Sequence, residues 1–252
     1  MDYQNEVKSA INGAKSKNFW RVEVFDSLPS TNDYLKKLAQ EKSEGEVVVS
    51  RVQTRGRGRQ NRVFSSLDGG LYVSLLLHPD TFPVNKITAM TAVSVRDAIE
   101  EVFGLDCDIK WVNDIFLGGK KVAGILAESS FLCESVKYVV LGIGVNVYTP
   151  KEGFPDELND IARALSDVKV EKRGELLAKI LDNIYAHYVE GVEYVSKYRE
   201  KSYLVGKLVT VDLKSERVEG IVLAVDDDCK LVLNTLTGVR KLFSGEVIKV
   251  RL

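Results

Sequence analysis

Apolar residues alternate with polar ones, or run without interruption, in several short segments rich in β-branched side chains, which is typical of β-strands. This pattern predicts strands at 20–25, 47–52, 71–77, 122–127 and 137–147. Apolar positions three or four residues apart predict helices at 31–41 and 85–103, and one long helix from residue 173 to about residue 203. We therefore expect an α+β protein in which helices pack on a mixed β-sheet.

The pattern changes after Val205 and Gly206, where the helical spacing ends. Short apolar segments then alternate with polar or glycine-containing turns, at 208–213, 218–225, 231–236, 239–243 and 247–250. Short strands at such regular spacing predict a small β-barrel. We expect two domains, at 1–204 and 205–252.

Composition and charge exclude several classes of protein. Hydrophobic residues make up 45% of the chain and charged residues 28%, with 35 basic against 36 acidic side chains, so neither a disordered chain nor a dedicated polyanion binder is expected. We find no apolar run long enough for a signal peptide core or a membrane span. The three cysteines are far apart and form no CxxC pair, which favours a reducing, cytoplasmic setting.

Positive charge is concentrated at 51–62, a segment with five arginines and no acid. Gly56 and Gly58 free the backbone to approach a ligand, and guanidinium groups bind carboxylate or phosphate oxygens through paired hydrogen bonds. Phe64 follows and offers a flat surface on which a nucleobase could stack. Composition leaves three interpretations open: a solvated basic loop, an anion site, or an RNA-binding loop.

A second candidate segment, 110–128, has two apolar runs around a Gly-Gly turn. This predicts two adjacent strands, with Lys110 at the entrance of the first and Lys121 at the start of the second. With Asn113 and Asp114, these lysines could neutralise phosphate charge and hold a metal-bound triphosphate. An exposed hairpin with ordinary turn residues is the alternative.

Short polar side chains form a third segment. Ser30, Thr31 or Asn32 is suited to cap the helix that follows, and the same groups could bind a small amide or urea. Residues 142–146 end an apolar strand with two glycines, which permit close approach of a ligand. Their spacing is not that of a dinucleotide-binding fingerprint or a P-loop, so dehydrogenase and P-loop kinase activities are disfavoured.

Together these segments closely resemble the biotin–protein ligase family, in its form without an N-terminal DNA-binding domain. The resemblance extends from about Trp20 to the C-terminal barrel. The motifs that carry it, in order, are Ser30-Thr31-Asn32, Gln53, Gly56-Arg57-Gly58-Arg59 with Arg62 and Phe64, Lys110-Trp111 with Asn113-Asp114, and Lys121-Val122-Ala123-Gly124-Ile125. Phe64 replaces a usual tryptophan and Val112 a usual proline, so we expect weaker adenine stacking and an extended strand at Val112.

The resemblance implies a two-step reaction. ATP and biotin form biotinyl-5′-adenylate and pyrophosphate, and a lysine of a biotin carboxyl carrier protein then takes the biotinyl group and releases AMP. It also implies an SH3-like C-terminal barrel, Mg²⁺ held mainly by the ATP phosphates, and a homodimer with no DNA or membrane partner.

The same resemblance implies roles for individual residues. The catalytic residues would be Arg59, Lys110, Asp114 and Lys121, with Asp114 orienting the acceptor amine or serving Mg²⁺. The biotin-binding residues would be Ser30, Thr31, Asn32, Gln53, Gly56, Arg57, Gly58, Arg59, Lys121, Gly124 and Leu126. The nucleotide-binding residues would be Arg59, Arg62, Phe64, Lys110, Asn113, Lys121 and Asn146.

Three other functions stay open. A lipoate–protein ligase would share the adenylate chemistry, although the arginine loop and the 121–125 motif favour biotin. An RNA-binding module would use the arginine loop and the barrel, against which the near-neutral net charge of −1 weighs. A ligand sensor would keep the pocket without the chemistry.

Overall fold

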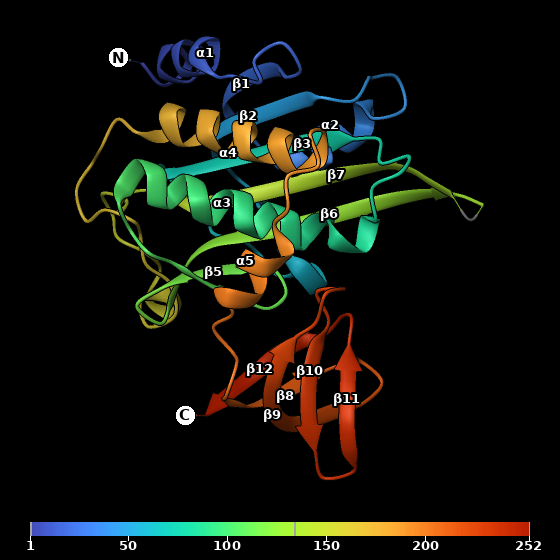
Figure 1. Ribbon diagram of the computed structural model, residues 1–252. Helices are drawn as coiled ribbons and strands as arrows, with labels where there is room; N and C mark the ends of the chain where they lie inside the picture. The colour runs from blue at the N-terminus through green and yellow to red at the C-terminus, as the bar shows by residue number, and fades with distance from the viewer. Residues whose placement is uncertain (1, 134, 252) are drawn as a thin grey trace.

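The computed structural model describes residues 2–133 and 135–251. Its largest element is a seven-stranded sheet with the order β1-β2-β3-β7-β6-β5-β4 (Figure 1). β1 and β2 are parallel, and the other neighbouring pairs are antiparallel. The strands are β1 (Arg21–Leu28), β2 (Glu46–Gln53), β3 (Gly70–Leu77), β4 (Asp108–Lys110), β5 (Asp114–Leu117), β6 (Lys120–Leu132) and β7 (Ser135–Asn146).

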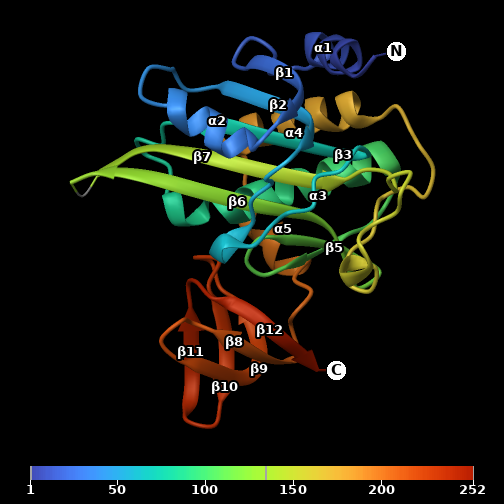
Figure 2. The same ribbon diagram turned by 180° about the vertical axis from the view of Figure 1, so that it is seen from behind.

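Helices cover both faces of this sheet. One face carries α1 (Tyr3–Gly13), α3 (Ile87–Phe103), α4 (Arg173–Tyr188) and α5 (Val195–Glu200), whereas α2 (Thr31–Leu38) lies on the other (Figures 1 and 2). Three short 3₁₀ turns complete the helical elements: η1 (Arg59–Asn61), η2 (Val84–Lys86) and η3 (Asp156–Leu158). In the part of the chain described, no helix is both long and apolar enough to cross a lipid bilayer.

β3 shows why both faces must be covered. Val73 and Leu75 join the main core beneath α3 and α4, whereas Leu76 packs with Leu35 of α2 in a second, smaller core. Successive side chains of a strand point to opposite faces, so every residue of β3 is buried. The uninterrupted apolar run in the sequence reflects this double burial.

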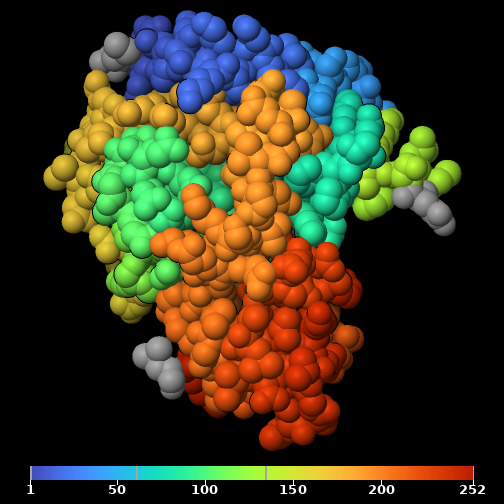
Figure 3. Space-filling model, viewed as in Figure 1, coloured from blue at the N-terminus to red at the C-terminus, as the bar shows by residue number. Residues whose placement is uncertain are grey.

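The C-terminal strands form a separate antiparallel sheet with the order β11-β10-β9-β8-β12. It packs against the end of the large domain near α5, while the β6–β7 hairpin projects from the side of the molecule (Figure 3). All five strands predicted for this region are present. They are β8 (Leu208–Asp212), β9 (Arg217–Val225), β10 (Leu231–Thr235), β11 (Gly238–Leu242) and β12 (Glu246–Arg251).

One helix prediction needs correction, and one helix was not predicted. The single helix expected from residue 173 to about 203 is wrong, because α4 ends at Tyr188 and α5 begins at Val195. Between them Gly191 has φ +74°, a left-handed conformation that glycine adopts readily and that ends helices. Helix α1 was not predicted, although its buried residues Tyr3 and Val7 are four positions apart.

The hairpin expected around Gly118-Gly119 is confirmed, because β5 pairs with β6 there, but the segment 110–128 differs in its number of strands. It contains three strands, and β5 lies between β4 and β6, so Lys110 and Lys121 are not on adjacent strands. Val112 lies in a turn rather than in an extended strand. The buried Trp111 indole N–H donates to the carbonyl of Cys229 at 3.0 Å, and this contact with the loop between β9 and β10 anchors the turn.

Candidate active site

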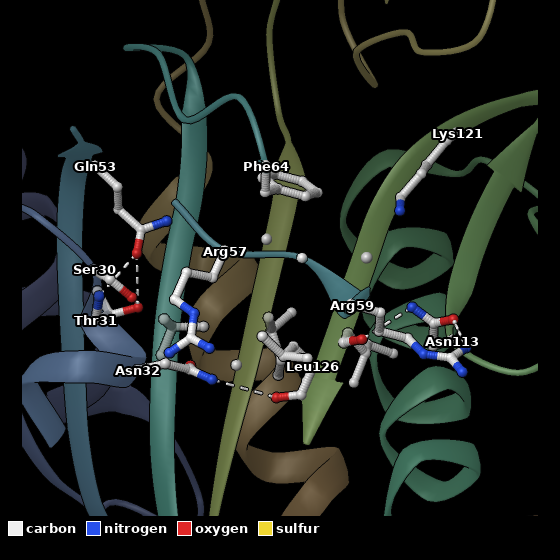
Figure 4. Close-up of a pocket in the computed structure, with 17 residues that line it drawn as sticks. Ser30, Thr31, Asn32, Gln53, Arg57, Arg59, Phe64, Asn113, Lys121 and Leu126 are labelled. Atoms are coloured by element: carbon white, nitrogen blue, oxygen red, sulfur yellow. Dashed lines mark hydrogen bonds between the residues drawn. The ribbon is translucent and has the colours of Figure 1, made fainter. Parts of the chain in front are cut away.

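A pocket opens on the face of the large sheet that carries α2 (Figure 4). Its empty space is about 470 Å³ with the open mouth included. Most of the residues predicted from the sequence line it. They are Ser30, Thr31, Asn32, Gln53, Arg57, Gly58, Arg59, Phe64, Asn113, Lys121, Gly124 and Leu126.

The pairing register of β6 and β7 places glycines side by side on the floor of this pocket. Gly142 on β7 pairs with Leu126 on β6, and Gly144 pairs with Gly124. These positions face the α2 side of the sheet, so three neighbouring sites on two strands carry no side chain there. The result is a shallow groove in which a ligand can lie against the backbone.

Neutral polar groups gather at one end of the groove (Figure 4). The Ser30 hydroxyl caps α2 by accepting a hydrogen bond from the Asp33 amide at 3.3 Å, which confirms the capping prediction. Thr31 donates through both its amide and its hydroxyl to the Gln53 side-chain oxygen, at 2.8 and 3.1 Å. These bonds hold the start of α2 against the end of β2.

Asn32 is held from three sides. Its side-chain oxygen accepts from the Ser74 hydroxyl at 2.5 Å, and its amide donates to a carboxylate oxygen of Glu128 at 2.8 Å. Beneath it, a Cβ built on Gly142 would lie 2.9 Å from Asn32 Cγ and still nearer Oδ1. A side chain at position 142 would therefore displace Asn32.

Cationic groups gather at the opposite end (Figure 4). Lys121 Nζ lies 2.7 Å from Asp114 Oδ1. The Arg59 guanidinium donates to Asn113 Oδ1 and to the carbonyl of Gly245, both at 2.9 Å. Because both acceptors of Arg59 are neutral, its positive charge remains available to a bound anion.

Phe64 covers the groove between the two ends (Figure 4). A Cβ on Gly144 would approach its ring to 2.7 Å, and one on Gly124 to 3.2 Å. Lys121 Nζ lies 5.7 Å from the ring centre. Phe64 thus packs on the glycine floor beside the cationic end, a position from which it can contact the chain of a ligand as well as a nucleobase.

Lys110 lies near this cationic end without lining the pocket. Its ammonium group is 5.1 Å from the centre of the Phe116 ring. Burial lowers the pKa of Lys110 below its usual value, and the positive charge of Lys121 adds to this effect while Asp114 opposes it. An ammonium group that has lost its hydration in this way is stabilised by a bound anion.

We expect Lys110→Met to raise the midpoint of thermal unfolding at neutral pH. A lowered pKa in the folded state means that burying the protonated amine costs stability, and the cost disappears as pH rises through the lowered pKa towards about 10.4. The gain should therefore be largest near pH 7 and absent near pH 10.4. Lys37→Met, on the exposed side of α2, is the control and should show no such trend. A Lys110→Met variant less stable than wild type at pH 7 would contradict this prediction.

Four further predicted residues lie outside the pocket lining. Asp114 reaches the pocket through Lys121, as described above. Gly56 lies under Ser66 and the Phe64 carbonyl, where a Cβ would collide with both, so its role in the structure is steric. Arg62 forms an ion pair with Glu246 of the C-terminal sheet. Asn146 donates to the carbonyl of Arg163 and lines a smaller neighbouring pocket.

Sequence reasoning did not assign several residues that the structure brings into the site. The sequence indicates that Gly142 and Gly144 permit close approach of a ligand, but their pairing with β6 is not readable from the chain. Asp33 and Glu128 both contact Arg57, at 2.5 and 3.3 Å. The remaining lining residues not predicted are Val73, Ile125 and Ile143.

The arginine segment is ordered by contacts within the chain. Arg51 pairs with Asp68 at 3.0 Å, and Arg57 pairs with two acids. Backbone bonds from Phe64 to Gly56 and from Gly58 to Arg62 fold residues 56–64 into a narrow hairpin. Arginines engaged in this way disfavour both a freely solvated loop and an RNA-binding strip.

Comparison with known proteins agrees with this geometry. Residues 24–146 match the model of the Biotin/lipoate A/B protein ligase family, and residues 204–250 match that of the Biotin protein ligase C terminal domain. A bifunctional ligase/repressor BirA of Bacillus subtilis is 37% identical, over 88% of this chain and 72% of the relative. A biotin–[acetyl-CoA-carboxylase] ligase of Mycobacterium tuberculosis is 27% identical, over 98% and 96%.

A solved structure has the same architecture. The biotin protein ligase from Aquifex aeolicus, in complex with biotin and ATP, superposes with a TM-score of 0.77 and 29% identity, over 92% of this chain and 98% of that one. Both the mixed sheet with its helices and the separate C-terminal sheet are thus found in a known ligase. On the family models, the identity to the Bacillus relative and this shared fold, the chain belongs to the biotin protein ligase family.

Proposed function

We propose that the chain is an ATP-dependent biotin–protein ligase. It joins the carboxylate of biotin to the α-phosphate of ATP and then transfers the biotinyl group to a lysine of a biotin carboxyl carrier protein. The observation that carries this proposal is one groove with a neutral hydrogen-bonding end and a cationic end above a glycine floor. Biotin has the matching chemistry, because a ureido ring and a carboxylate terminate an apolar middle.

The neutral end supports binding of the ureido ring. Its hydroxyl and amide groups, on Ser30, Thr31, Asn32 and Gln53, supply both donors and acceptors without net charge. Gly124 and Leu126 then line the path of the apolar chain towards Lys121. Groups locked by their neighbours, as Asn32 and Gln53 are, bind a rigid ring with little loss of side-chain freedom.

The cationic end supports the first half-reaction. A carboxylate oxygen of biotin attacks the α-phosphorus, and the bond to the pyrophosphate oxygen breaks, so that pyrophosphate leaves with the electron pair. Both reactants are anions and repel each other on approach. Lys121, Arg59 and Lys110 lower this repulsion and stabilise the charge that gathers on the phosphoryl oxygens.

Mg²⁺ enters this proposal together with ATP. Among the residues described, no group of three or more His, Cys, Asp or Glu side chains could hold a metal by itself. Asp114 is one carboxylate at the cationic end, and one carboxylate with substrate phosphates is a coordination that Mg²⁺ accepts. The bound ion would neutralise part of the phosphate charge.

The second half-reaction needs a neutral amine. The acceptor lysine attacks the acyl carbon, the bond from that carbon to the phosphate oxygen breaks, AMP leaves, and the new amide nitrogen loses a proton. With a pKa near 10.4, such a lysine is neutral in roughly one molecule per few thousand at pH 7. We propose that Asp114 orients this amine and accepts its proton.

We expect Asp114→Asn to slow transfer from preformed biotinyl-adenylate to the carrier by about a hundredfold, because the amide cannot accept the proton. Rapid-quench measurement of carrier biotinylation from isolated adenylate reports this step alone. Normal transfer with weaker adenylation and a shifted Mg²⁺ dependence would instead assign Asp114 to the metal. Wild-type rates in both half-reactions would leave it a turn residue.

Several wider features belong to the same proposal. The carrier domain of a biotin-dependent carboxylase is the partner, and the near-balanced charge of the chain supports no role for DNA. We propose a homodimer through the sheet. Strand β6 supports this proposal, because β5 pairs with β6 only as far as Gly124, whereas β7 pairs with it as far as Leu132.

We also propose domains at 1–204 and 205–252 and an SH3-like C-terminal fold. We further propose a cytoplasmic setting, which the free thiols of Cys107, Cys133 and Cys229 support.

Biotin-dependent release of pyrophosphate tests the proposed function directly. Purified protein is supplied with ATP, Mg²⁺ and either biotin or lipoate, and a carrier domain is then added. We expect pyrophosphate with biotin and covalent biotin on the carrier. Release with lipoate instead would make the chain a lipoate–protein ligase, and binding of biotin without pyrophosphate would make it a sensor.

A further inference from the structure

We infer that Asp33 and Glu128 are positioning residues that fasten the arginine loop over the groove through Arg57 and so set how long the adenylate stays bound. We call the contacts of Arg57 with these two acids the Arg57 strap. Its Nη1 lies 2.5 Å from Asp33 Oδ1, and its Nη2 lies 3.3 Å from Glu128 Oε1. The inference rests on the proposed function for the identity of the ligand.

The strap joins three separate elements. Arg57 is on the loop that follows β2, Asp33 is in the first turn of α2, and Glu128 is on β6. Arg57 lies across the middle of the pocket, between its neutral and cationic ends (Figure 4). The side chain of Arg57 is thus tied to a helix and to a strand at once.

Arg57 is part of the hydrogen-bonded hairpin that the arginine loop forms. The amide of Phe64 donates to the carbonyl of Gly56 at 3.0 Å, and that of Gly58 donates to the carbonyl of Arg62 at 2.8 Å. Fastening Arg57 therefore also fixes the hairpin at 56–64, including the ring of Phe64 above the glycine floor. Releasing Arg57 would loosen the whole cover of the groove.

Glu128 couples the strap to the neutral end of the pocket. Its Oε2 accepts from Asn32 at 2.8 Å, while its Oε1 is also 2.9 Å from Lys36. A ligand that orders Asn32 would thus order Glu128 and, through it, Arg57. Loop closure and occupation of the neutral end are linked by one carboxylate.

Charge distinguishes Arg57 from Arg59. Arg57 and Lys36 face Asp33 and Glu128, so two bases balance two acids within the chain. The hydrogen bond that Arg57 donates to Asp33 raises the pKa of Arg57, and the pKa of Asp33 is low because the contacts with Arg57 and Lys36 outweigh its partial burial. Arg59, in contrast, faces neutral acceptors. Arg57 therefore acts through the loop rather than as a counter-ion for phosphate.

Partly exposed ion pairs are individually weak, so we expect moderate effects on dissociation. Asp33→Asn and Glu128→Gln should each speed release of preformed biotinyl-adenylate about three- to tenfold, because an opened loop uncovers the ligand. The rate of adenylation within the bound complex should change less than twofold. Arg57→Ala should have a larger effect than either single acid variant, because it releases both contacts.

A double-mutant cycle separates the strap from a general loss of structure. Adding Glu128→Gln to Arg57→Ala should not speed release further, because the contact is already gone. Labelled adenylate is formed on the enzyme, chased with excess unlabelled ligand, and followed by filtration. Glu216→Gln is the matched control, since it removes an equally charged ion pair with Arg240 in the C-terminal sheet and should leave release unchanged.

A second readout does not depend on catalysis. Trypsin cleaves after the arginines of the loop, and the strap should protect these bonds, so Asp33→Asn and Glu128→Gln should be cut several times faster than wild type or Glu216→Gln. Wild-type rates of adenylate release and loop cleavage in both variants would overturn the inference, as would fully additive effects in the cycle. Failure of the wild-type protein to form adenylate would instead refute the proposed function, while the cleavage test would still decide the strap.

Discussion

Lys121→Ala is expected to slow adenylate formation by about a hundredfold, comparable with removing one preorganised donor from a charged transition state. Its ammonium group lies at the cationic end of the groove, 2.7 Å from Asp114, where we propose that the biotin carboxylate and the α-phosphate meet. Without this cation, the two anions approach against an unscreened repulsion in a partly closed site. Single-turnover formation of adenylate at saturating ATP and biotin measures the effect.

Lys120→Ala is the matched control, because Lys120 is the neighbouring residue and donates to the carbonyl of Asn159. It should retain adenylation within about twofold of wild type, because Lys120 does not line the pocket. Thermal unfolding of both variants checks that the fold is intact. Normal single-turnover adenylation in Lys121→Ala would remove Lys121 from the mechanism, whatever its place in the pocket.

Gly142→Ala is expected to weaken biotin binding by at least about tenfold, which corresponds to about 1.4 kcal/mol. The added methyl group would occupy the space of Asn32 Oδ1, so Asn32 must move away from Ser74 and Glu128. The neutral end of the groove then loses its geometry, and a buried amide loses its hydrogen bonds. Isothermal titration with biotin measures the affinity, and thermal unfolding measures the accompanying loss of stability.

Gly13→Ala is a suitable control, because a Cβ at Gly13 would meet nothing within 4 Å and the position is helical. It should bind biotin normally and be slightly more stable, since alanine favours helix over glycine by up to about 1 kcal/mol. Adding Asn32→Ala to Gly142→Ala should recover stability but not affinity. Wild-type affinity in Gly142→Ala would show that Asn32 does not shape the biotin site.

The elements of the fold were predicted best where the hydrophobic pattern is strongest. β3 and the part of β7 from Val139 to Asn146 are buried on both faces and appear in the sequence as apolar runs, so both strands were predicted nearly to their ends. Helix α1 offers a weaker pattern, with buried residues limited to Tyr3, Val7 and Ile11, and it was missed. Its stability comes from packing against α4, which no local pattern reports.

At Trp111, in contrast to the missed helix α1, an element was predicted that the structure does not contain. Apolar residues on both sides suggested one strand through Val112, yet the chain turns there, and the Trp111 indole bonds to Cys229 more than a hundred positions away. A contact over such a separation has no signature in the neighbouring sequence. The same limit explains why Lys110 and Lys121 were placed on adjacent strands, since strand order depends on pairing that a local window does not contain.

By itself, the sequence determined which chemistry is present: the arginine loop, the lysines with Asn113 and Asp114, the small polar residues before α2, and the motif order shared with biotin protein ligases. Residue types carry their charge and hydrogen-bonding groups wherever they lie, so this much is readable from the chain. Only the tertiary structure decided how these groups are paired. It set Gly142 beneath Asn32 and gave Arg57 two acids and Arg59 neutral acceptors, and from these contacts we infer different roles for the two arginines. The physical reason is that the electrostatic role of a charge depends on what lies within a few ångströms of it, and those neighbours come from distant parts of the chain.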